Sequence, residues 1–205
     1  MAERTAVTPN SRGTRSRELV LDAAERLMAQ QGYEAASVSA LVDEAGVPAS
    51  SIYHYFGSKE GVLLAVMERG AERFFEALPI PDRRQGSQSE HLAGLVETVA
   101  EALQGNPHFL RILIVMATQP VNASGGEVHR VVNRVRDLAL ERLRDQMQIV
   151  FGVARDGADA DRLARFALAS FDGAFVAQQS SPRVRLGDLV GHLPAALIAV
   201  RKDLA

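Results

Sequence analysis

The chain has 205 residues, of which 47% are hydrophobic and 23% charged, and its formal net charge is −2. This length and apolar content allow one or two compact units with a substantial core, while the near-neutral charge excludes a strongly basic, non-specific nucleic-acid binder. The absence of cysteine excludes disulfides, zinc–thiolate sites and thiol chemistry.

The N-terminal segment, residues 1–14, is polar and basic, and we expect a flexible arm there. A leader without a binding role fits residues 1–13. Arg15 and Arg17 follow beside the expected start of the first helix, where they are placed to contact DNA phosphates or the minor groove. No apolar run follows the arm, and no stretch reaches the ~18 apolar residues that a membrane span needs. We therefore expect a cytoplasmic protein.

Three short helices are predicted next. The first covers residues 16–31, with an apolar stripe at Val20, Ala23, Ala24, Leu27 and Met28. The second begins after Ser37, a suitable cap, and ends at Gly46. Pro48 is expected to start the third, which runs to residue 56. The very short turn between the last two helices predicts a helix-turn-helix.

The third helix has an unusual outward face. Helical spacing places its bulky buried side around Ile52, with Ser50 and His54 pointing outward. Ala49, Ser51 and Tyr53 lie on the flanks. This face lacks the Glu and Lys residues of an ordinary surface helix. Hydroxyl, imidazole and methyl groups instead suit the phosphates and base edges of a DNA major groove.

Lys59 gives two alternatives. A cation just inside a helix capped by Ser58 is placed unfavourably against the helix dipole. The placement becomes favourable if an external phosphate contacts both the lysine and the N-terminus of the helix. The alternative is that Glu60 offsets the lysine and both side chains are solvated. The local chemistry alone favours neither.

The stretch GVPASSIYHYFGSKEGVL, preceded by LDAAERLMAQQGYEAASVSALVDEA, resembles the DNA-binding domain of the TetR family of bacterial transcriptional regulators. The resemblance covers residues 16–64 without a gap. It implies phosphate contacts from Ser37, Tyr53, His54 and Lys59, and base contacts from Ala49, Ser50 and Ser51. Two residues depart from the family pattern: Pro48 replaces a frequent capping serine, and Gly61 replaces a frequent glutamate, which leaves the capping box of the fourth helix incomplete.

A fourth helix is expected over residues 58–78, long enough to belong to two domains, and Pro79 and Pro81 end it. The predicted domains are a basic arm (1–14), a helix-turn-helix domain (15–64) and a helical ligand-binding and dimerisation domain (65–205). Five further helices are expected, at residues 91–103, 107–117, 127–151, 159–179 and 186–204. The second of these should be buried, and the third should place Leu138 on its apolar side. Gly125 and Gly126 should form a turn, and Pro194 should kink the last helix.

The last two helices combine small residues, which allow close backbone approach, with large apolar ones. An ordinary core explains either set alone, but a two-fold four-helix bundle accounts for both, and the TetR resemblance implies it. The expected dimer interface comprises Phe166, Ala169, Ser170, Gly173, Ala177, Leu193 and Leu197.

Aromatic and methionine side chains that could line a cavity for an apolar effector are also present. They are Phe74, Phe75, Leu78, Phe109, Leu113, Met116, Phe171 and Phe175. Each could equally belong to an ordinary helical core. The resemblance implies a pocket formed among the fourth to eighth helices.

No catalytic motif, metal-ligand spacing or cofactor-binding loop is found, so we expect neither an enzyme nor a metal or cofactor site. Taken together, the sequence predicts an all-α, homodimeric repressor of transcription that binds a pseudo-palindromic double-stranded DNA operator and is released by a small apolar effector. Two alternatives stay open. One is an architectural DNA binder without an effector, and the other is a helical small-molecule-binding domain in which the helix-turn-helix is only scaffold.

Overall fold

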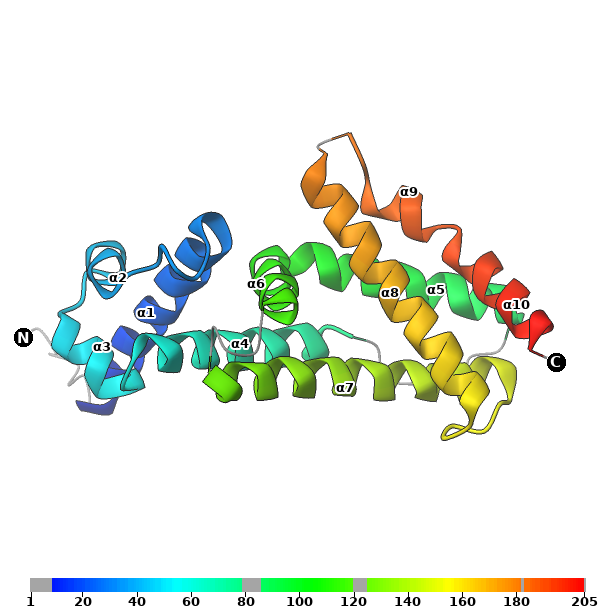
Figure 1. Cartoon of the computed structure of the whole chain (residues 1–205), viewed down its shortest axis with the longest axis horizontal. Helices are drawn as coiled ribbons and strands as arrows, with labels where there is room; N and C mark the ends of the chain where they lie inside the picture. The colour runs from blue at the N-terminus through cyan, green and yellow to red at the C-terminus, as the bar shows by residue number, and fades with distance from the viewer. Residues whose placement is uncertain (1–8, 79–85, 120–124, 182, 205) are drawn as a thin grey trace, which may run out of the picture. The chain divides into compact units, whose positions relative to one another are not determined.

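In the computed structural model, residues 9–78, 86–119, 125–181 and 183–204 are described, and every regular element among them is an α-helix (Figure 1). The all-α prediction is confirmed. The chain divides into two compact units: Met1–Ala71 with His108–Val132, and Glu72–Pro107 with Asn133–Ala205. We call them unit 1 and unit 2. The helices α4 (Lys59–Glu76) and α7 (Gly125–Phe151) contribute residues to both.

The first helix of unit 1, α1 (Pro9–Gln31), begins seven residues before the expected start near Ser16. Pro9 fits the first helical position because its missing N–H has no partner in the first turn of any helix. Residues 9–14, expected in the flexible arm, therefore belong to the helix. Residues 1–8 of that arm lie outside the described residues. The apolar stripe from Val20 to Met28 is buried as predicted.

The helices α2 (Val38–Ala45) and α3 (Ala49–Phe56) pack beside α1 and form the predicted helix-turn-helix (Figure 1). The Ser37 hydroxyl accepts a hydrogen bond from the Ala40 amide, a cap of the kind that contributes about 1 kcal/mol. Gly46 has the left-handed conformation, with φ of 65°, and its N–H bonds the Val42 carbonyl. Leu41 and Ile52 are fully buried and hold the two helices on the core.

A charged cluster joins α1 to α4 within unit 1. The Arg69 guanidinium donates hydrogen bonds to Glu18 (3.0 Å), Asp22 (2.7 Å) and Glu25 (2.7 Å), three carboxylates spaced along one face of α1. Burial lowers the pKa of Arg69, but the three carboxylates outweigh this and raise it above its ordinary value. Because the guanidinium is mostly buried, these bonds are better shielded from solvent than an ordinary surface pair.

The helix α6 (Pro107–Thr118) also belongs mainly to unit 1. Phe109 packs on Gly70 of α4 so closely that a Cβ atom at Gly70 would lie 2.3 Å from its ring. Arg111 donates to the Ala29 carbonyl of α1 at 3.1 Å. The prediction that this stretch is buried is confirmed for most of its apolar residues but wrong for Val115, which is exposed.

Unit 2 is built from α5 (Gln88–Gly105), most of α7, α8 (Ala158–Ser180), α9 (Leu186–Val190) and α10 (Leu193–Asp203). The helices α9 and α10 pack against both α5 and α8 (Figure 1). Ser87 and Glu90 form a complete capping box at the start of α5, which explains why the helix begins before the expected residue 91.

Charged pairs join α7 to α8. Arg136 donates to Asp172 at 2.5 Å, and Arg144 donates to Asp161. Arg142 donates to the Phe75 carbonyl at the end of α4 (3.1 Å), and its guanidinium lies over the Phe75 ring. A cation at the C-terminal end of a helix is favoured by the helix dipole. Arg142 therefore fixes the last turn of α4 on α7.

Leu138, on the apolar side expected for α7, is 37% exposed. Three smaller expectations are wrong. Gly125 and Gly126 form the first residues of α7 instead of a turn. The predicted last helix is two helices, α9 and α10, separated at Gly191 and His192. Pro194 does not kink it, because it occupies the first turn of α10, where no N–H is needed.

Candidate nucleic-acid interface

The start of α2 presents two exposed serines. Ser37 and Ser39 share a hydrogen bond between their hydroxyls at 2.9 Å. The first turn of a helix also carries unpaired backbone N–H groups and a partial positive charge, so an anion is favoured there. Ser37 was expected at this site and Ser39 was not. The signal that could have indicated Ser39 is the recurrence of a hydroxyl two residues after the cap.

The turn into α3 differs slightly from the prediction. Pro48 is the cap residue, with extended backbone angles (φ −62°, ψ 147°), and the helix itself begins at Ala49. A proline side chain offers no hydrogen bond, so α3 starts without a side-chain cap. The replacement of the family's frequent capping serine by Pro48 suggested this. The Ser51 and Ile52 amides donate to the Pro48 carbonyl, at 3.0 and 3.4 Å, so Pro48 supports the first turn of α3 through its backbone alone.

The outward face of α3 has the orientation that the sequence predicts. Ile52 points into the core, while Ala49, Ser50 and His54 are exposed and Tyr53 is 53% exposed. We call these four exposed residues the α3 surface. Ser51 is partly buried at its edge. The orientation is confirmed, and DNA contact by these side chains stays a prediction.

Aromatic contacts hold the C-terminal end of α3. Tyr55 packs edge-on against His54, with ring centroids 5.1 Å apart, and against Phe56 at 6.3 Å. A Cβ atom at Gly13 of α1 would lie 3.3 Å from the Tyr55 hydroxyl, so this glycine allows the close approach. Tyr55 and Phe56 are partly buried. These contacts limit how far the exposed end of α3 can move.

Arg15 and Arg17 lie within α1 and not beside its start. Arg15 is exposed. The Arg17 guanidinium lies 5.6 Å from the Phe56 ring centroid and donates to Glu18 at 3.3 Å. Such exposed pairs are weak, so Arg17 can exchange Glu18 for another anion. The Phe56 contact places this cation next to the end of α3.

Lys59, the first residue of α4, has protein partners that neither expected alternative included. Its Nζ atom donates to the Glu34 carbonyl at 3.0 Å and lies 4.3 Å from the Tyr33 ring centroid. An ammonium group carries three donors. The carbonyl uses one, so the side chain is held in place while two donors stay available. Sequence reasoning missed Tyr33, although the Gly32-Tyr33 pair was part of the recognised pattern.

Tyr33 is itself anchored. Burial raises its pKa to about 12, and the nearby charges of Glu60 and Glu34 add to the effect. The phenol therefore keeps its proton at neutral pH and hydrogen-bonds the Glu60 carboxylate. The pKa of Glu60 is lowered by its own backbone N–H and by the Ser58 hydroxyl, and to a smaller extent by Tyr33. These groups form one network around the first turn of α4.

Gly61 is required at its position by sterics. Its amide donates to the Ser58 hydroxyl at 3.0 Å, so Ser58 caps α4 as predicted. A Cβ atom at Gly61 would lie 1.9 Å from the Phe56 carbonyl oxygen, far inside contact distance. The carboxylate that the capping box lacks has no room in this backbone. The close approach joins the end of α3 directly to the start of α4.

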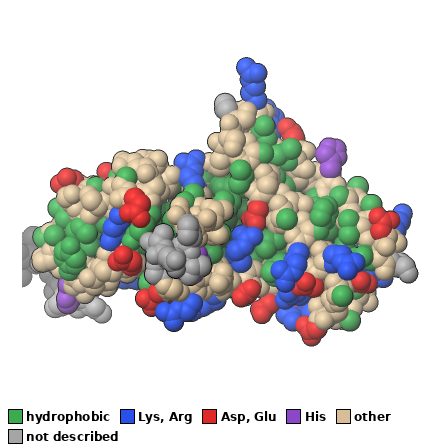
Figure 2. Space-filling model, in the orientation of Figure 1, with side chains coloured by type: hydrophobic (Ala, Val, Ile, Leu, Met, Phe, Trp, Pro, Cys, Tyr) green, Lys and Arg blue, Asp and Glu red, His purple; other side chains and the backbone are tan. Residues whose placement is uncertain are grey.

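The expected dimer residues divide into two groups. Phe166 (38% exposed) and Val176 (44%), a residue that was not expected, lie on one face of α8. We call the face the α8 surface; its members are Phe166, Ala169, Ser170, Gly173, Val176 and Ala177. Figure 2 shows uncharged surface over the C-terminal half of α8. Leu193 and Leu197 are buried inside unit 2 and lie outside this surface.

The expected pocket residues are mostly buried core residues. Phe109, Leu113 and Met116 are buried in unit 1. In unit 2, Phe74, Phe75, Phe171 and Phe175 are buried and Leu78 is partly buried. The rings of Phe74 and Phe75 are packed edge to face, 5.4 Å apart. The role of these eight residues in ligand binding stays a prediction.

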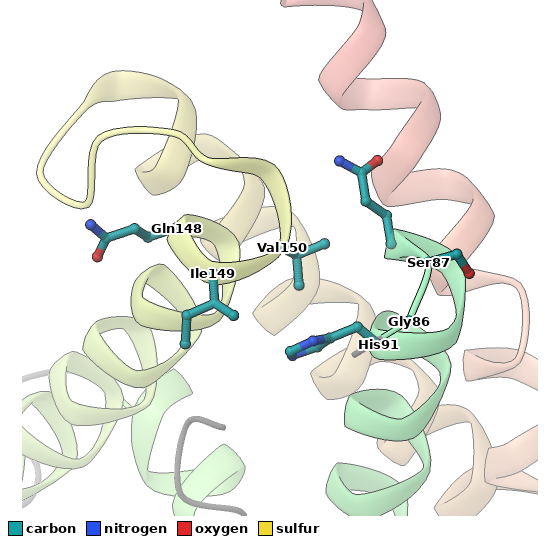
Figure 3. Close-up of a pocket in the computed structure, with 7 residues that line it drawn as sticks. Gly86, Ser87, His91, Gln148, Ile149 and Val150 are labelled. Carbon is teal, nitrogen blue, oxygen red and sulfur yellow. The ribbon is translucent and has the colours of Figure 1, made fainter. Parts of the chain in front are cut away.

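A cleft of about 430 Å³ in unit 2 lies elsewhere (Figure 3). It is lined by the start of α5, with Ser87 and His91, and by Gln148, Ile149 and Val150 near the end of α7. His91 also meets the buried Gln146, with Nε2 and Oε1 3.2 Å apart. None of the eight expected pocket residues lines this cleft.

The described residues contain neither a metal-binding cluster nor a membrane-spanning helix. No group of three or more histidine or carboxylate side chains there is placed to hold a metal ion. No helix within the described ranges combines the length and the apolar character that crossing a membrane requires.

Comparison with known proteins identifies the segment that carries the helix-turn-helix. Residues 20–66 match the model of the bacterial regulatory proteins of the tetR family. The transcriptional regulator BetI of Rhizobium meliloti is 25% identical over 162 residues, which cover 79% of this chain and 77% of BetI. The transcriptional repressor AcnR of Corynebacterium diphtheriae is 28% identical over 85% of this chain and 86% of AcnR.

The fold is also that of a solved regulator. The structure of FadR from Bacillus subtilis in complex with stearoyl-CoA superimposes with a TM-score of 0.65, at 22% identity. The match covers 89% of this chain and 98% of that chain. The matched proteins are regulators and repressors of transcription, a class without enzymatic activity.

Proposed function

The chain belongs to the TetR family of bacterial transcriptional regulators, and on this premise we propose that it is a homodimeric, sequence-specific repressor released from DNA by a small-molecule effector. The observation that carries the proposal is the α3 surface. It offers hydroxyl, phenol and imidazole groups on an exposed helix face that has no carboxylate and no ammonium group. We place the protein in the cytoplasm, where its DNA partner lies.

Residues 15–64 form the DNA-binding domain in this proposal. Ser50 and Ala49 face base edges in the major groove, with Ser51 at their side. Phosphates are held by Ser37, Tyr53, His54 and Lys59, and by Arg15 and Arg17 on α1. The network around Lys59 and the aromatic contacts at the end of α3 support these roles, because they hold the side chains in defined positions before DNA arrives.

Residues 65–205 supply dimerisation. The α8 surface pairs with the same surface of a second copy, as a two-fold interface requires. Its small residues, such as Ala169 and Gly173, allow close helix approach, and Phe166 and Val176 provide apolar area. Two α3 helices then enter successive major grooves of a pseudo-palindromic site, about 34 Å apart.

The effector is a small, largely apolar molecule. The aromatic and methionine residues predicted to line its pocket support this class. The B. subtilis regulator FadR, which has the same fold, binds stearoyl-CoA in its solved structure. The effector acts by favouring conformations in which the two α3 helices no longer fit successive grooves, a population shift. The helix α4, which belongs to both units, carries the change.

Selection of bound duplexes from a random DNA pool tests the proposal, with sedimentation of the free protein beside it. We expect a two-fold symmetric motif and a dimer. His54→Ala should weaken binding to the selected duplex. His192→Ala is the matched control because His192 is also exposed but lies in unit 2. It should bind like the unmodified protein.

Other outcomes identify the alternatives. A chain that binds all duplexes equally, with no small molecule in a thermal-shift screen changing its melting temperature, is an architectural DNA binder. A chain that binds a small molecule but no duplex at low salt is a ligand-binding domain with a scaffold helix-turn-helix. Either result, or a monomer in sedimentation, contradicts the proposal.

A further inference from the structure

Tyr33 and Lys59 form a contact between two segments that are distant in sequence. Tyr33 lies in the turn that follows α1, and Lys59 opens α4. The Lys59 ammonium lies over the face of the Tyr33 ring, 4.3 Å from its centroid, and donates to the Glu34 carbonyl at 3.0 Å. A cation at this distance is attracted by the negative face of the ring.

Lys59 needs such support because its position is otherwise unfavourable. The partial positive charge at the start of α4 repels an ammonium group in the first turn. A lysine side chain also has four rotatable carbons and a strongly hydrated charge, so it holds no single direction by itself. The ring face and the carbonyl together select one direction.

We propose that Tyr33 is a positioning residue for DNA binding, whose ring holds the Lys59 ammonium ready for a backbone phosphate. The inference rests on the proposed function, in which Lys59 is a phosphate contact. The carbonyl of Glu34 uses one ammonium donor, and a phosphate oxygen takes another. Tyr33 itself, which is buried, does not touch the DNA.

The phenol hydroxyl has a different partner from the ring face. It hydrogen-bonds Glu60, which in turn bonds Ser58 and its own backbone N–H. This bond orients the ring but does not itself attract the lysine. The proposal therefore separates two substitutions: Tyr33→Phe keeps the ring face, and Tyr33→Leu removes it.

The test measures how the affinity for a mixed-sequence duplex, three helical turns long, depends on salt concentration. Each phosphate contact adds about 0.9 to the slope of log K against log salt, so Lys59→Ala should lower the slope by about 1.8 in a dimer. Tyr33→Leu should give a slope between that of the unmodified protein and that of Lys59→Ala. It should also weaken binding about two- to fivefold for each protomer. Tyr33→Phe should keep the slope of the unmodified protein.

Two comparisons separate positioning from simple structural support. In the double variant Tyr33→Leu with Lys59→Ala, the slope should equal that of Lys59→Ala alone. Phe151→Leu, an aromatic-to-leucine change in unit 2, should leave the slope unaltered. Melting curves establish that each variant is folded. If Tyr33→Leu fails to fold, Tyr33→Met replaces it, because it keeps a large flexible side chain without a ring face.

The outcomes are distinguishable. An unmodified protein that binds no duplex overturns the proposed function and this inference with it. An unmodified protein that binds DNA with a Lys59-dependent slope, while a folded Tyr33→Leu or Tyr33→Met keeps that slope, overturns this inference alone. Additive effects of the two substitutions in the double variant also overturn it, because Tyr33 would then act independently of Lys59.

Discussion

The α3 surface and the α8 surface are both exposed helix faces without charged side chains, yet they differ in hydrogen-bonding capacity. The α3 surface carries the hydroxyls of Ser50 and Tyr53 and the imidazole of His54. On the α8 surface, the one hydroxyl, that of Ser170, already donates to the Phe166 carbonyl of its own helix at 2.8 Å. The first surface can bond a polar partner, and the second can only pack against an apolar one.

This difference shows how uncharged surface is assigned to a kind of partner. Missing charge alone indicates a covered face, because exposed helices normally carry Lys, Glu and Arg. The free donors and acceptors then decide the class: DNA for the α3 surface, and a second copy of the chain for the α8 surface. Each of the following changes affects one surface, or a segment next to it, and leaves the other surface intact.

The largest expected effect comes from Gly173→Leu on the α8 surface. A Cβ atom at Gly173 meets no atom within 4 Å, so the protomer has room for it, and leucine favours a helix more than glycine does. The bulky side chain should nevertheless separate the dimer, with affinity for the selected operator falling about a hundredfold or more. Sedimentation measures whether the dimer has separated, and titration with the operator measures the affinity. A dimer of unchanged affinity would exclude Gly173 from the interface.

The next effect concerns charge beside the α3 surface. Arg17→Ala should weaken binding to every duplex at low salt. Because a dimer loses two phosphate contacts, the affinity of the variant should fall about tenfold less than that of the unmodified protein between about 50 and about 200 mM salt. Glu18 keeps its bond to Arg69, so α1 stays attached to α4. Arg183→Ala, an exposed arginine in unit 2, is the control. Equal salt slopes for the two variants would count against an Arg17 contact with DNA.

A smaller effect is expected for Ser50→Ala, which removes a hydroxyl from the α3 surface. Discrimination at one base pair of each half-site should fall by about 1 kcal/mol, with little change in binding to mixed DNA. Ser180→Ala removes a comparable hydroxyl from α8, one that bonds the Val176 carbonyl of its own helix. Repeating the random-pool selection with each variant measures its base preference. An identical motif from Ser50→Ala would mean that Ser50 reads no base.

The smallest effect is a pH dependence at the start of α4, the helix that follows α3. The pKa of Glu60 lies below its ordinary value of 4.5, chiefly because its own backbone N–H and the Ser58 hydroxyl bond the carboxylate. A lowered pKa gives a stabilisation that is complete above the ordinary value and lost as the pH falls through the folded-state value. The melting temperature should therefore fall less steeply below pH 4.5 in Glu60→Gln than in the unmodified protein. Parallel curves of melting temperature against pH for the two proteins would contradict this prediction.

Local rules predicted much of unit 1. Ser37 as a cap, Gly46 in the left-handed conformation and Ile52 as the buried centre of α3 were all read from neighbouring residues, because each depends only on its own helix. The start of α1 was predicted wrongly. Ser16 is a good cap, but the sequence before it also allows a helix, and local preference could not choose between two permitted starts.

Packing between helices was not predictable in the same way. The apolar run at residues 107–117 predicted a buried helix, and Leu193 and Leu197 were expected at the dimer interface. The structure instead exposes Val115 and buries both leucines inside unit 2. A helical stripe shows which residues share a face and not what covers that face. For the same reason, the apolar residues expected to line a pocket could not be told from ordinary core.

The sequence by itself determined the helical content, the helix-turn-helix and the uncharged face of α3, because caps, turns and periodicity act within a few residues. Only the tertiary structure decided where Lys59 and Arg69 find their partners, since those partners lie 25 residues or more away along the chain. It also decided why Gly61 must be glycine. The Phe56 carbonyl approaches Gly61 only after α3 and α4 have packed together.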